Sequence, residues 1–440
     1  MTMDGTRASV RKKQRVNKKA KDVTIVDSVK MLLLVQRRST FEFDLICNDD
    51  DSRDFYCWLN EGKNNCDFLA ENGFGLPIHD KNAPLISFHE TNGVKATTCK
   101  GANMIMAFLA ARKLFTEDKP YLRFTYIDNI IHGLSNKTEL SSLISTHFNL
   151  IVLCPSADVR KAGNEGNVQV QELHRFCAND LLRAQVFTYP PLSLVFFNEE
   201  KLKRDKVFEP LMLPFVYKEV TTSLAESARN AFEEFKTTYP ENQHVDKIQE
   251  TGMVAKTMNN HCALGIYFLQ QSKDSSDSWE LTCDNDDSHL LLSGVMLFEP
   301  FIPALKKSET RIYATLIEGN KVSTHYKVET SLGPNRTTTL EKAAQAVGKK
   351  SADSAETKLI KHAYELFCTQ FPQWNNAVKH LTFRFDVVHC SDKKLYVNEV
   401  DVLPLAYLFL DDYFGTKNYL MEVTDTMATY IKKHWSCWPA

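Results

Sequence analysis

The chain has 440 residues, of which 43% are hydrophobic and 25% charged, and its formal net charge is −2. This composition is ordinary for a water-soluble protein, and the length allows two or three domains. The near-neutral charge argues against a nucleic-acid partner, and no apolar run in the sequence is long enough to span a membrane. The eleven cysteines form no CxxC pair and no Cys/His metal spacing, which predicts reduced thiols in a cytoplasmic protein.

The N-terminal half predicts a basic tail followed by an α/β domain. The stretch "RASVRKKQRVNKKAKD" is strongly basic and nearly devoid of apolar residues, so residues 1–22 are expected to be a disordered tail. From Val23 onward, strand patterns alternate with helix patterns, which favours a largely parallel sheet in a domain over residues 23–205. Buried strands are predicted at 29–37, 148–156 and 190–197, and helices at 101–115 and 167–185.

The second half predicts a further α/β unit, which we divide into lobes at 206–295 and 296–440. Good helix formers followed by Pro predict a helix at 221–240, and a strand, loop and strand follow at 252–271. The run "GVMLFEPFI" predicts a strand that ends in a Glu-Pro turn. A hairpin at 309–328, a helix at 354–369 and a second hairpin at 381–402 complete the unit.

The second hairpin, "LTFRFDVVHCSDKKLYVNEVD", carries an unusual concentration of charge. Side chains alternate along a strand, so Arg384 and Asp386 share one face, as do Glu399 and Asp401. Pairing of the strands would place three carboxylates and a guanidinium in one patch. Clustered carboxylates repel each other unless they are protonated or neutralised, and such hard oxygen ligands suit Mg²⁺. A solvated edge hairpin can carry the same pattern, so the hairpin alone leaves both interpretations open.

Three weaker signals precede this hairpin in the chain. Lys256 ends an apolar strand before a polar loop, where a lysine could donate to phosphate oxygens. The segment "FEPFI" at 298–302 offers an acceptor–donor edge between apolar walls, which a planar base requires. Glu309, on the following strand, could accept hydrogen bonds from ribose hydroxyls.

Taken together, the order of Lys256, Glu299, Glu309, Asp386 and Glu399 resembles the ATP-grasp superfamily. Asp386 and Glu399 approach its D-x(12)-E-x-N metal pattern, with Arg384 two residues before the Asp. The resemblance implies an ATP-grasp fold, in which an N-terminal α/β pre-ATP-grasp domain is followed by two α+β lobes that clasp ATP. Asp401 departs from the pattern, because the family usually has Asn there, and it would add negative charge beside a triphosphate.

The resemblance also implies roles for individual residues. The segments "VAKTMNNHCALG" and "EPFI" are similar to the synapsin version of the fold, and "HYKVETSLGPNRTTT" resembles a basic segment that synapsins and ribosomal-protein glutamate ligases place against the γ-phosphate. Asp386, Glu399 and Asp401 would be metal ligands, and Arg384, Arg336 and Arg311 would be catalytic. The implied nucleotide-binding residues are Lys206 (or, alternatively, Lys218), Lys256, His261, Glu299, Phe301, Ile302, Glu309 and Lys327.

The implied activity is that of an ATP- and Mg²⁺-dependent ligase, with Mn²⁺ as an alternative metal. It would join a small-molecule or peptide carboxylate to an amine or thiol through an acylphosphate, and a homodimer is the commonest closed assembly for such a chain. Two alternatives remain open. One is a kinase of the same fold that phosphorylates an alcohol such as an inositol phosphate. The other is a non-catalytic, ATP-binding interaction or regulatory protein of the synapsin type.

Overall fold

The computed structural model describes residues 30–35, 45–46, 67–75, 88–91, 94–97, 122–154, 172–173, 175–189, 194, 197, 201–220, 223–257, 266–272, 278–282, 294–306, 309–317, 321–330, 338–339, 354–375, 378, 381–390, 394–402 and 428–429. The predictions for the tail, for the helix at 101–115, for His261 and for Arg336 lie outside the described residues. Within the part of the chain that is described, no helix is long and apolar enough to cross a membrane.

The N-terminal unit is built on a parallel sheet, as the sequence predicts. Its strand order is β5-β1-β6-β7, with β1 in an interior position and paired on both sides. Met31 to Leu34 of β1 are fully buried, because a central parallel strand is covered on both faces. The strands are β1 (Met31–Val35), β5 (Leu122–Tyr126), β6 (Leu150–Cys154) and β7 (Phe187–Tyr189); the helices are α3 (Ile127–Gly133), α4 (Lys137–His147) and η6 (Phe176–Leu181). A small sheet of order β2-β4-β3 is formed by β2 (Leu45–Ile46), β3 (Phe88–Thr91) and β4 (Val94–Thr97).

The strand predicted at 190–197 is wrong. β7 ends at Tyr189, and both Leu194 and Phe197 are helical and buried. Two consecutive prolines follow β7, and neither has the backbone N–H that a continuing strand would donate. Phe197 packs edge-on against Phe371, with ring centroids 4.7 Å apart, which connects this segment to the C-terminal lobe.

The middle lobe is a five-stranded antiparallel sheet of order β11-β10-β9-β12-β8. Its main helix, α8, begins with a capping interaction in which the Ser223 hydroxyl accepts from the Glu226 N–H. Apolar side chains of α8 pack on one face of the sheet and leave the other face for polar groups. The elements are β8 (Val216–Val220), α8 (Leu224–Thr238), α9 (Gln243–Asp246), α10 (Ile248–Thr251), β9 (Met253–Thr257), β10 (Ile266–Gln271), β11 (Trp279–Thr282) and β12 (Gly294–Pro300).

The C-terminal lobe is a second five-stranded sheet, of order β15-β14-β13-β16-β17. The helix α11 (Ala355–Gln370) covers one face, where Tyr364 and Phe367 pack against Phe383 of β16. The strands are β13 (Glu309–Ile317), β14 (Lys321–Thr330), β15 (Thr338–Thr339), β16 (Thr382–His389) and β17 (Leu395–Asp401). Short helical turns occur at η3 (Ala70–Phe74), η4 (Leu134–Asn136), η7 (Glu209–Leu211), η8 (Pro303–Lys306) and η10 (Pro372–Trp374).

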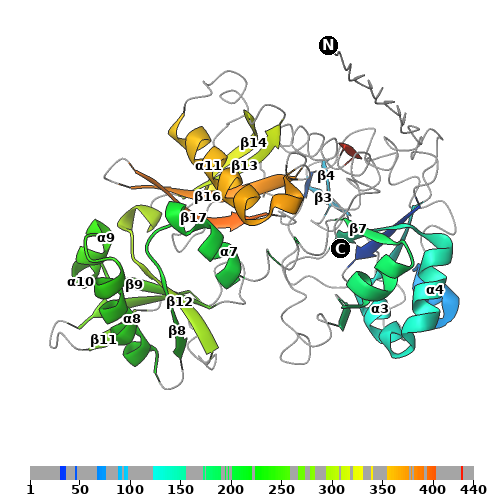
Figure 1. Cartoon of the computed structure of the whole chain (residues 1–440), viewed down its shortest axis with the longest axis horizontal. Coiled ribbons are helices and arrows are strands. Elements are labelled where there is room, and N and C mark those ends of the chain that lie inside the picture. The colour runs from blue at the N-terminus through cyan, green and yellow to red at the C-terminus, as the bar shows by residue number, and fades with distance from the viewer. Residues whose placement is uncertain are drawn as a thin grey trace, which may run out of the picture.

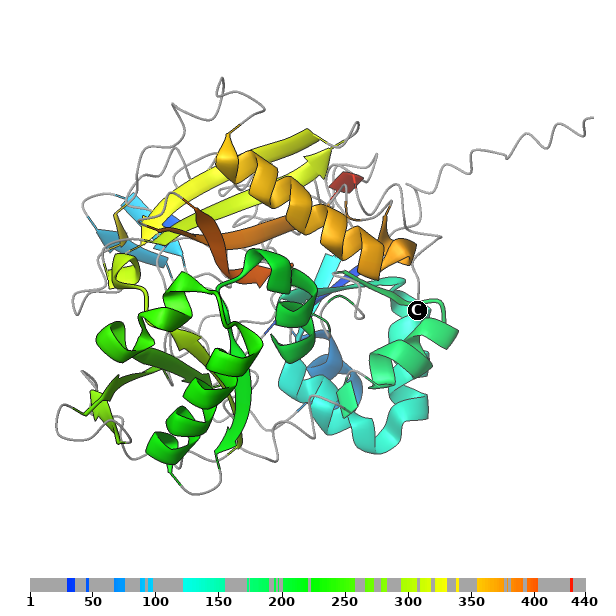
Figure 2. The same cartoon turned by 60° about the vertical axis from the view of Figure 1, so that its left-hand side comes forward.

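The helix α7 (Lys201–Phe208) lies where the middle and C-terminal lobes meet (Figures 1 and 2). It packs against α11 and β17, and the segment after it forms a parallel bridge from Met212 to Val397.

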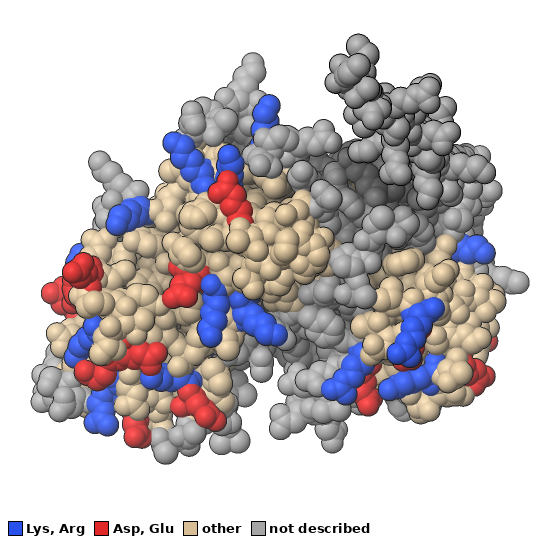
Figure 3. Space-filling model, in the orientation of Figure 1, with Lys and Arg blue, Asp and Glu red and all other residues tan. Residues whose placement is uncertain are grey.

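The expected domain boundaries at 205/206 and 295/296 fall inside α7 and β12. Because β12 pairs with both β8 and β9, we propose that the middle lobe extends through Pro300. Charged side chains of both signs are interspersed on the face shown in Figure 3.

A buried carboxylate holds part of the N-terminal unit together. Asp67 Oδ1 accepts from the Thr125 hydroxyl at 2.7 Å and from the Ala70 N–H at 3.0 Å. Its Oδ2 accepts from the Tyr126 N–H and the Asn129 amide, both at 2.8 Å. Thr125 and Asn129 are fully buried, so Asp67 provides a hydrogen-bond acceptor for both side chains where β5 passes into α3.

We predict that Asp67→Ala lowers the free energy of local unfolding around β5 and α3 by about 3 kcal/mol, since several buried donors lose their acceptor. Hydrogen-exchange mass spectrometry on peptides covering Leu122–Gly133 would measure the change. Asp128→Ala, which removes the same charge from the first turn of α3, should cost less than about 1 kcal/mol. Equal protection in the two variants would contradict this role of Asp67.

Candidate functional site

The charged hairpin forms as predicted, and its register brings its charges together. β16 and β17 are antiparallel, with Asp386 opposite Glu399 and Arg384 opposite Asp401. Phe383 and Phe385 face α11, so alternation turns Arg384 and Asp386 toward the opposite side of the sheet. On the neighbouring strand β13, Arg311 pairs with Asp386 in the ladder.

A β-bulge adds a residue to this face. Asp386 pairs with Glu399 but Val387 pairs with Val397, so Asn398 is an extra residue in β17. Val397 and Val400 are buried, and the polar pair between them, Asn398 and Glu399, makes contacts on the charged side. The break in alternation is visible in "VNEV" and is the sequence signal that could have predicted the bulge.

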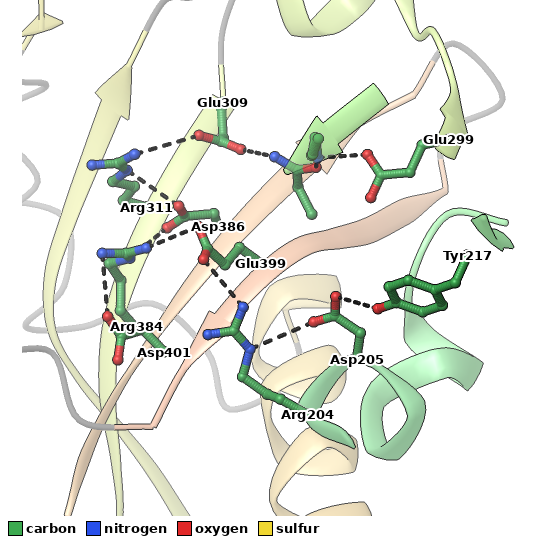
Figure 4. Close-up of polar contacts among 12 residues, drawn as sticks. Arg204, Asp205, Tyr217, Glu299, Glu309, Arg311, Arg384, Asp386, Glu399 and Asp401 are labelled. Carbon is green, nitrogen blue, oxygen red and sulfur yellow. Dashed lines mark hydrogen bonds and ion pairs between the residues drawn. The ribbon is translucent and has the colours of Figure 1, made fainter. Parts of the chain in front are cut away.

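Arg384 holds the carboxylates of the hairpin together (Figure 4). Its Nε lies 3.0 Å from Asp386 Oδ1, and its two Nη atoms lie 3.2 Å from Glu399 Oε2 and 3.5 Å from Asp401 Oδ2. Arg384 and Asp386 are only 8% and 1% exposed, so each charge depends on the others for compensation. Burial disfavours the charged guanidinium, but the carboxylates outweigh this effect and hold the pKa of Arg384 well above its ordinary value.

A second set of contacts comes from α7. Arg204 Nη2 lies 3.2 Å from Glu399 Oε1, and its Nε lies 3.5 Å from Asp205 Oδ1. Asp205 Oδ2 accepts from the Tyr217 hydroxyl of β8 at 2.9 Å, which connects α7 to the middle lobe (Figure 4). Burial, followed by the charge of Asp205, raises the pKa of Tyr217, so this hydroxyl stays protonated and donates.

The middle sheet contributes Lys256 and Glu299 from the face opposite α8. Their charged groups lie 2.5 Å apart, and Lys256 Nζ also donates to Asn398 Oδ1 at 2.9 Å. Asn398 Nδ2 in turn donates to Glu309 Oε1 at 2.5 Å, so one amide connects the two lobes. Burial and then the nearby Asp386 charge raise the pKa of Glu309 to about 7. We call this group the ionic cluster: Arg204, Asp205, Lys256, Glu299, Glu309, Arg311, Arg384, Asp386, Asn398, Glu399 and Asp401.

One glycine directs the chain into β9 and therefore positions Lys256. Gly252 follows α10 with φ of +89°, a conformation that L side chains rarely adopt, and a Cβ there would collide with the Leu269 carbonyl oxygen. Its own carbonyl accepts from the Phe301 N–H at 3.0 Å. The same turn therefore places the apolar pair Phe301 and Phe268, whose rings pack edge-on, beside the end of β12.

The remaining predicted residues are placed as follows. Ile302 is buried in a small apolar cluster beside η8, and Lys327 lies in β14 opposite Ile312. Lys218 forms an ion pair with Glu234 of α8, on the other face of the middle sheet from Tyr217. Lys206 is exposed on α7, on the far side of the helix from Arg204.

Helical spacing explains why α7 contributes residues other than the predicted Lys206 to the ionic cluster. Positions 201, 204, 205 and 208 follow an i, i+3, i+4, i+7 pattern and form one face of the helix, which Lys206 does not share. Burial lowers the pKa of Lys201, and the Glu399 carboxylate partly offsets this effect, as expected for a lysine close to the cluster. The sequence analysis missed Lys201, Arg204 and Asn398. For the first two, the helical pattern was the available signal.

The cluster fits a magnesium ion through two of its members. Within the described part of the chain, no group of three or more His, Cys, Asp or Glu side chains converges as a metal site. Mg²⁺ commonly takes one or two carboxylates and completes its coordination with water and phosphate oxygens. Asp386 and Glu399, which face each other across the hairpin, form such a pair, with Asp401 beside Arg384.

The chain is similar to several solved structures at low sequence identity. D-cycloserine synthetase is 13% identical with a TM-score of 0.45, and the match covers 74% of this chain and 95% of that one. An ATP-grasp ligase from Chryseobacterium gregarium is 11% identical (TM-score 0.37; 91% and 97% covered), as is D-alanyl-alanine synthetase A from Vibrio cholerae (TM-score 0.37; 64% and 77% covered). No protein-family model and no curated protein sequence matches the chain.

The order of the structural units agrees with the order expected from the sequence. An α/β unit precedes two α+β lobes, and the ionic cluster lies between these lobes.

We predict that Asn398→Ala lowers the free energy of unfolding by about 1–3 kcal/mol, because a largely buried lysine and a buried glutamate each lose a hydrogen-bond partner. Asn398→Asp should be less stable still, since it places a carboxylate against Glu309. Urea denaturation would measure both changes, with Asn375→Ala, an exposed position after η10, as the control within about 0.5 kcal/mol of wild type. Wild-type stability in both Asn398 variants would show that the bridge contributes nothing.

Proposed function

We propose that this protein is an ATP- and Mg²⁺-dependent ligase that joins a carboxylate to an amine or a thiol through an acylphosphate. The observation that supports this most directly is the pair Asp386 and Glu399, which Arg384 holds opposite each other between two lobes, with Asp386 buried and Glu399 partly exposed. A protein does not bury so many charges unless they are compensated, and this arrangement suits a metal-bound triphosphate.

The nucleotide would lie between the middle and C-terminal lobes. Phe301 and Ile302 would contact the adenine, and Glu309 would face the ribose. Lys256 would hold phosphate oxygens, with Lys201 of α7 as a second phosphate-binding lysine in place of the predicted Lys206. Asp386 and Glu399 would hold Mg²⁺, which would offset the negative charge of the phosphate oxygens.

In this reaction the protein positions groups and compensates charge. A substrate carboxylate oxygen attacks the γ-phosphorus, ADP leaves, and an amine then attacks the acyl carbon and releases phosphate. Arg384 and Arg311, and Arg336 from the basic segment, would stabilise the negative oxygens that develop during both steps. The position of the cluster between the two lobes would limit the access of water to the acylphosphate.

We predict that ATP binds in the presence of Mg²⁺ with a dissociation constant of about 1–100 µM, and that Asp386→Asn and Glu399→Ala each weaken binding by about tenfold or more. Isothermal titration calorimetry with and without Mg²⁺ would measure this. Glu356→Gln, a charge change near the start of α11 and away from the cluster, is the matched control and should bind like wild type. Unchanged ATP affinity in both hairpin variants would remove the hairpin from the nucleotide site.

The ligase and kinase alternatives differ in the fate of one oxygen atom. With an ¹⁸O-labelled carboxylate substrate, the ligase reaction should transfer one ¹⁸O into the released phosphate, because the bridging oxygen of the acylphosphate leaves with phosphorus. Mass spectrometry of the phosphate would detect it, and hydroxylamine should trap the same intermediate as a hydroxamate. Phosphate transfer to an alcohol without label in free phosphate would favour the kinase, and binding without turnover of any tested acid would favour the non-catalytic binder.

A further inference from the structure

Every carboxylate oxygen of Asp386 and Glu399 already faces a guanidinium group. The two Asp386 oxygens lie 3.0 Å from Arg384 Nε and 3.3 Å from Arg311 Nε. The two Glu399 oxygens lie 3.2 Å from Arg384 Nη2 and 3.2 Å from Arg204 Nη2. The atoms that would hold a metal ion are therefore engaged by three arginines from three different elements, β16, β13 and α7 (Figure 4).

Of these arginines, Arg204 is the one that lies on α7, outside the C-terminal sheet. It is 4% exposed, although the Glu399 side chain that it contacts is 29% exposed. Its Nε faces Asp205, which accepts from Tyr217, so this end of the guanidinium is held from the middle-lobe side while the other end contacts Glu399. An arginine in this setting keeps its charge at any ordinary pH and cannot leave the site as a neutral group.

A free divalent cation that approached Glu399 would have to displace Arg204 or share an oxygen with it at short range. Displacement would leave a buried guanidinium with only part of its compensation, which is strongly unfavourable. A nucleoside triphosphate makes the displacement of Arg204 less unfavourable, because its oxygens offer the displaced guanidinium a new anionic partner through charge-assisted hydrogen bonds.

We propose that Arg204 determines the form in which the metal enters: it blocks Glu399 from free divalent cations and gives up this carboxylate only when nucleotide phosphate arrives with the metal. Arg204 is on this view a specificity-determining residue that acts through Glu399. The inference rests on the proposed function, because it takes Asp386 and Glu399 to be the metal-binding pair.

Mn²⁺ is the appropriate probe, because it prefers the same oxygen ligands as Mg²⁺ and its free form is visible by electron paramagnetic resonance. The full-length wild-type protein should bind Mn²⁺ in the presence of ATP, but without ATP its dissociation constant for Mn²⁺ should be weaker than about 1 mM. Arg204→Met should bind Mn²⁺ without ATP at least about tenfold more tightly than wild type, since one charge-assisted competitor of the metal is gone.

Three further variants make the result specific. Adding Glu399→Gln to Arg204→Met should abolish the gain in Mn²⁺ binding. Arg204→Lys should increase Mn²⁺ affinity less than Arg204→Met does. A lysine keeps the positive charge, but a single ammonium group cannot contact Asp205 and Glu399 together as a guanidinium does. Lys203→Met, on the exposed side of the same helix, should behave like wild type.

The outcomes separate the inference from the proposed function. Mn²⁺–ATP binding by wild type, together with a gain of free Mn²⁺ binding in Arg204→Met that depends on Glu399, supports the inference. If wild type binds free Mn²⁺ through Glu399 as tightly as it binds Mn²⁺ in the presence of ATP, the inference about Arg204 is wrong, but the proposed nucleotide site is unaffected. This measurement uses only the wild-type protein, so it does not depend on whether a variant folds. Mn²⁺–ATP binding by wild type without any gain in Arg204→Met also overturns it. Failure of wild type to bind Mn²⁺–ATP at all overturns the proposed function itself.

Discussion

The rest of the site depends on the ion pairs that the Arg384 guanidinium forms with the carboxylates of its own hairpin. One guanidinium reaches Asp386, Glu399 and Asp401, and it does so from a position that is itself buried. Without it, the hairpin would carry three neighbouring carboxylates on a sheet face covered by another lobe, and the hairpin would not pack there. The hairpin register follows from the same requirement, because a one-residue slip would turn Arg384 and Asp386 toward the apolar side chains of α11.

At the ionic cluster the two lobes contact each other through polar groups. Lys256 and Asn398 connect the middle sheet to β17, and Tyr217 and Asp205 connect β8 to α7. Apolar packing between α7 and the C-terminal lobe holds the helix in the position from which these contacts are made. Polar contacts can be exchanged for contacts to a charged ligand at modest cost, whereas an apolar interface would have to be exposed.

This exchange suits a protein that handles phosphate. Under the proposed function, the cations that compensate carboxylates in this structure would compensate phosphate oxygens once a nucleotide binds, so few buried charges would lack a partner in either case. The fixed position of Arg204 would make α7 sensitive to whatever occupies Glu399, although α7 belongs to the chain segment that leads into the middle lobe.

The sequence by itself determined the elements with strong periodicity and the chemistry of the hairpin. Alternation specified that Arg384 and Asp386 share a face, and caps and spacing specified α8 and α11, because these depend on residues close together in the chain. Only the tertiary structure decided that Lys201 and Arg204, and not Lys206, face the carboxylates, since this depends on which side of α7 packs against β17. It also decided the role of Asn398, which reaches Lys256 and Glu309 through a bulge in β17 and the approach of two sheets far apart in the sequence. Contacts of this kind follow from packing between distant segments, and local propensity does not contain that information.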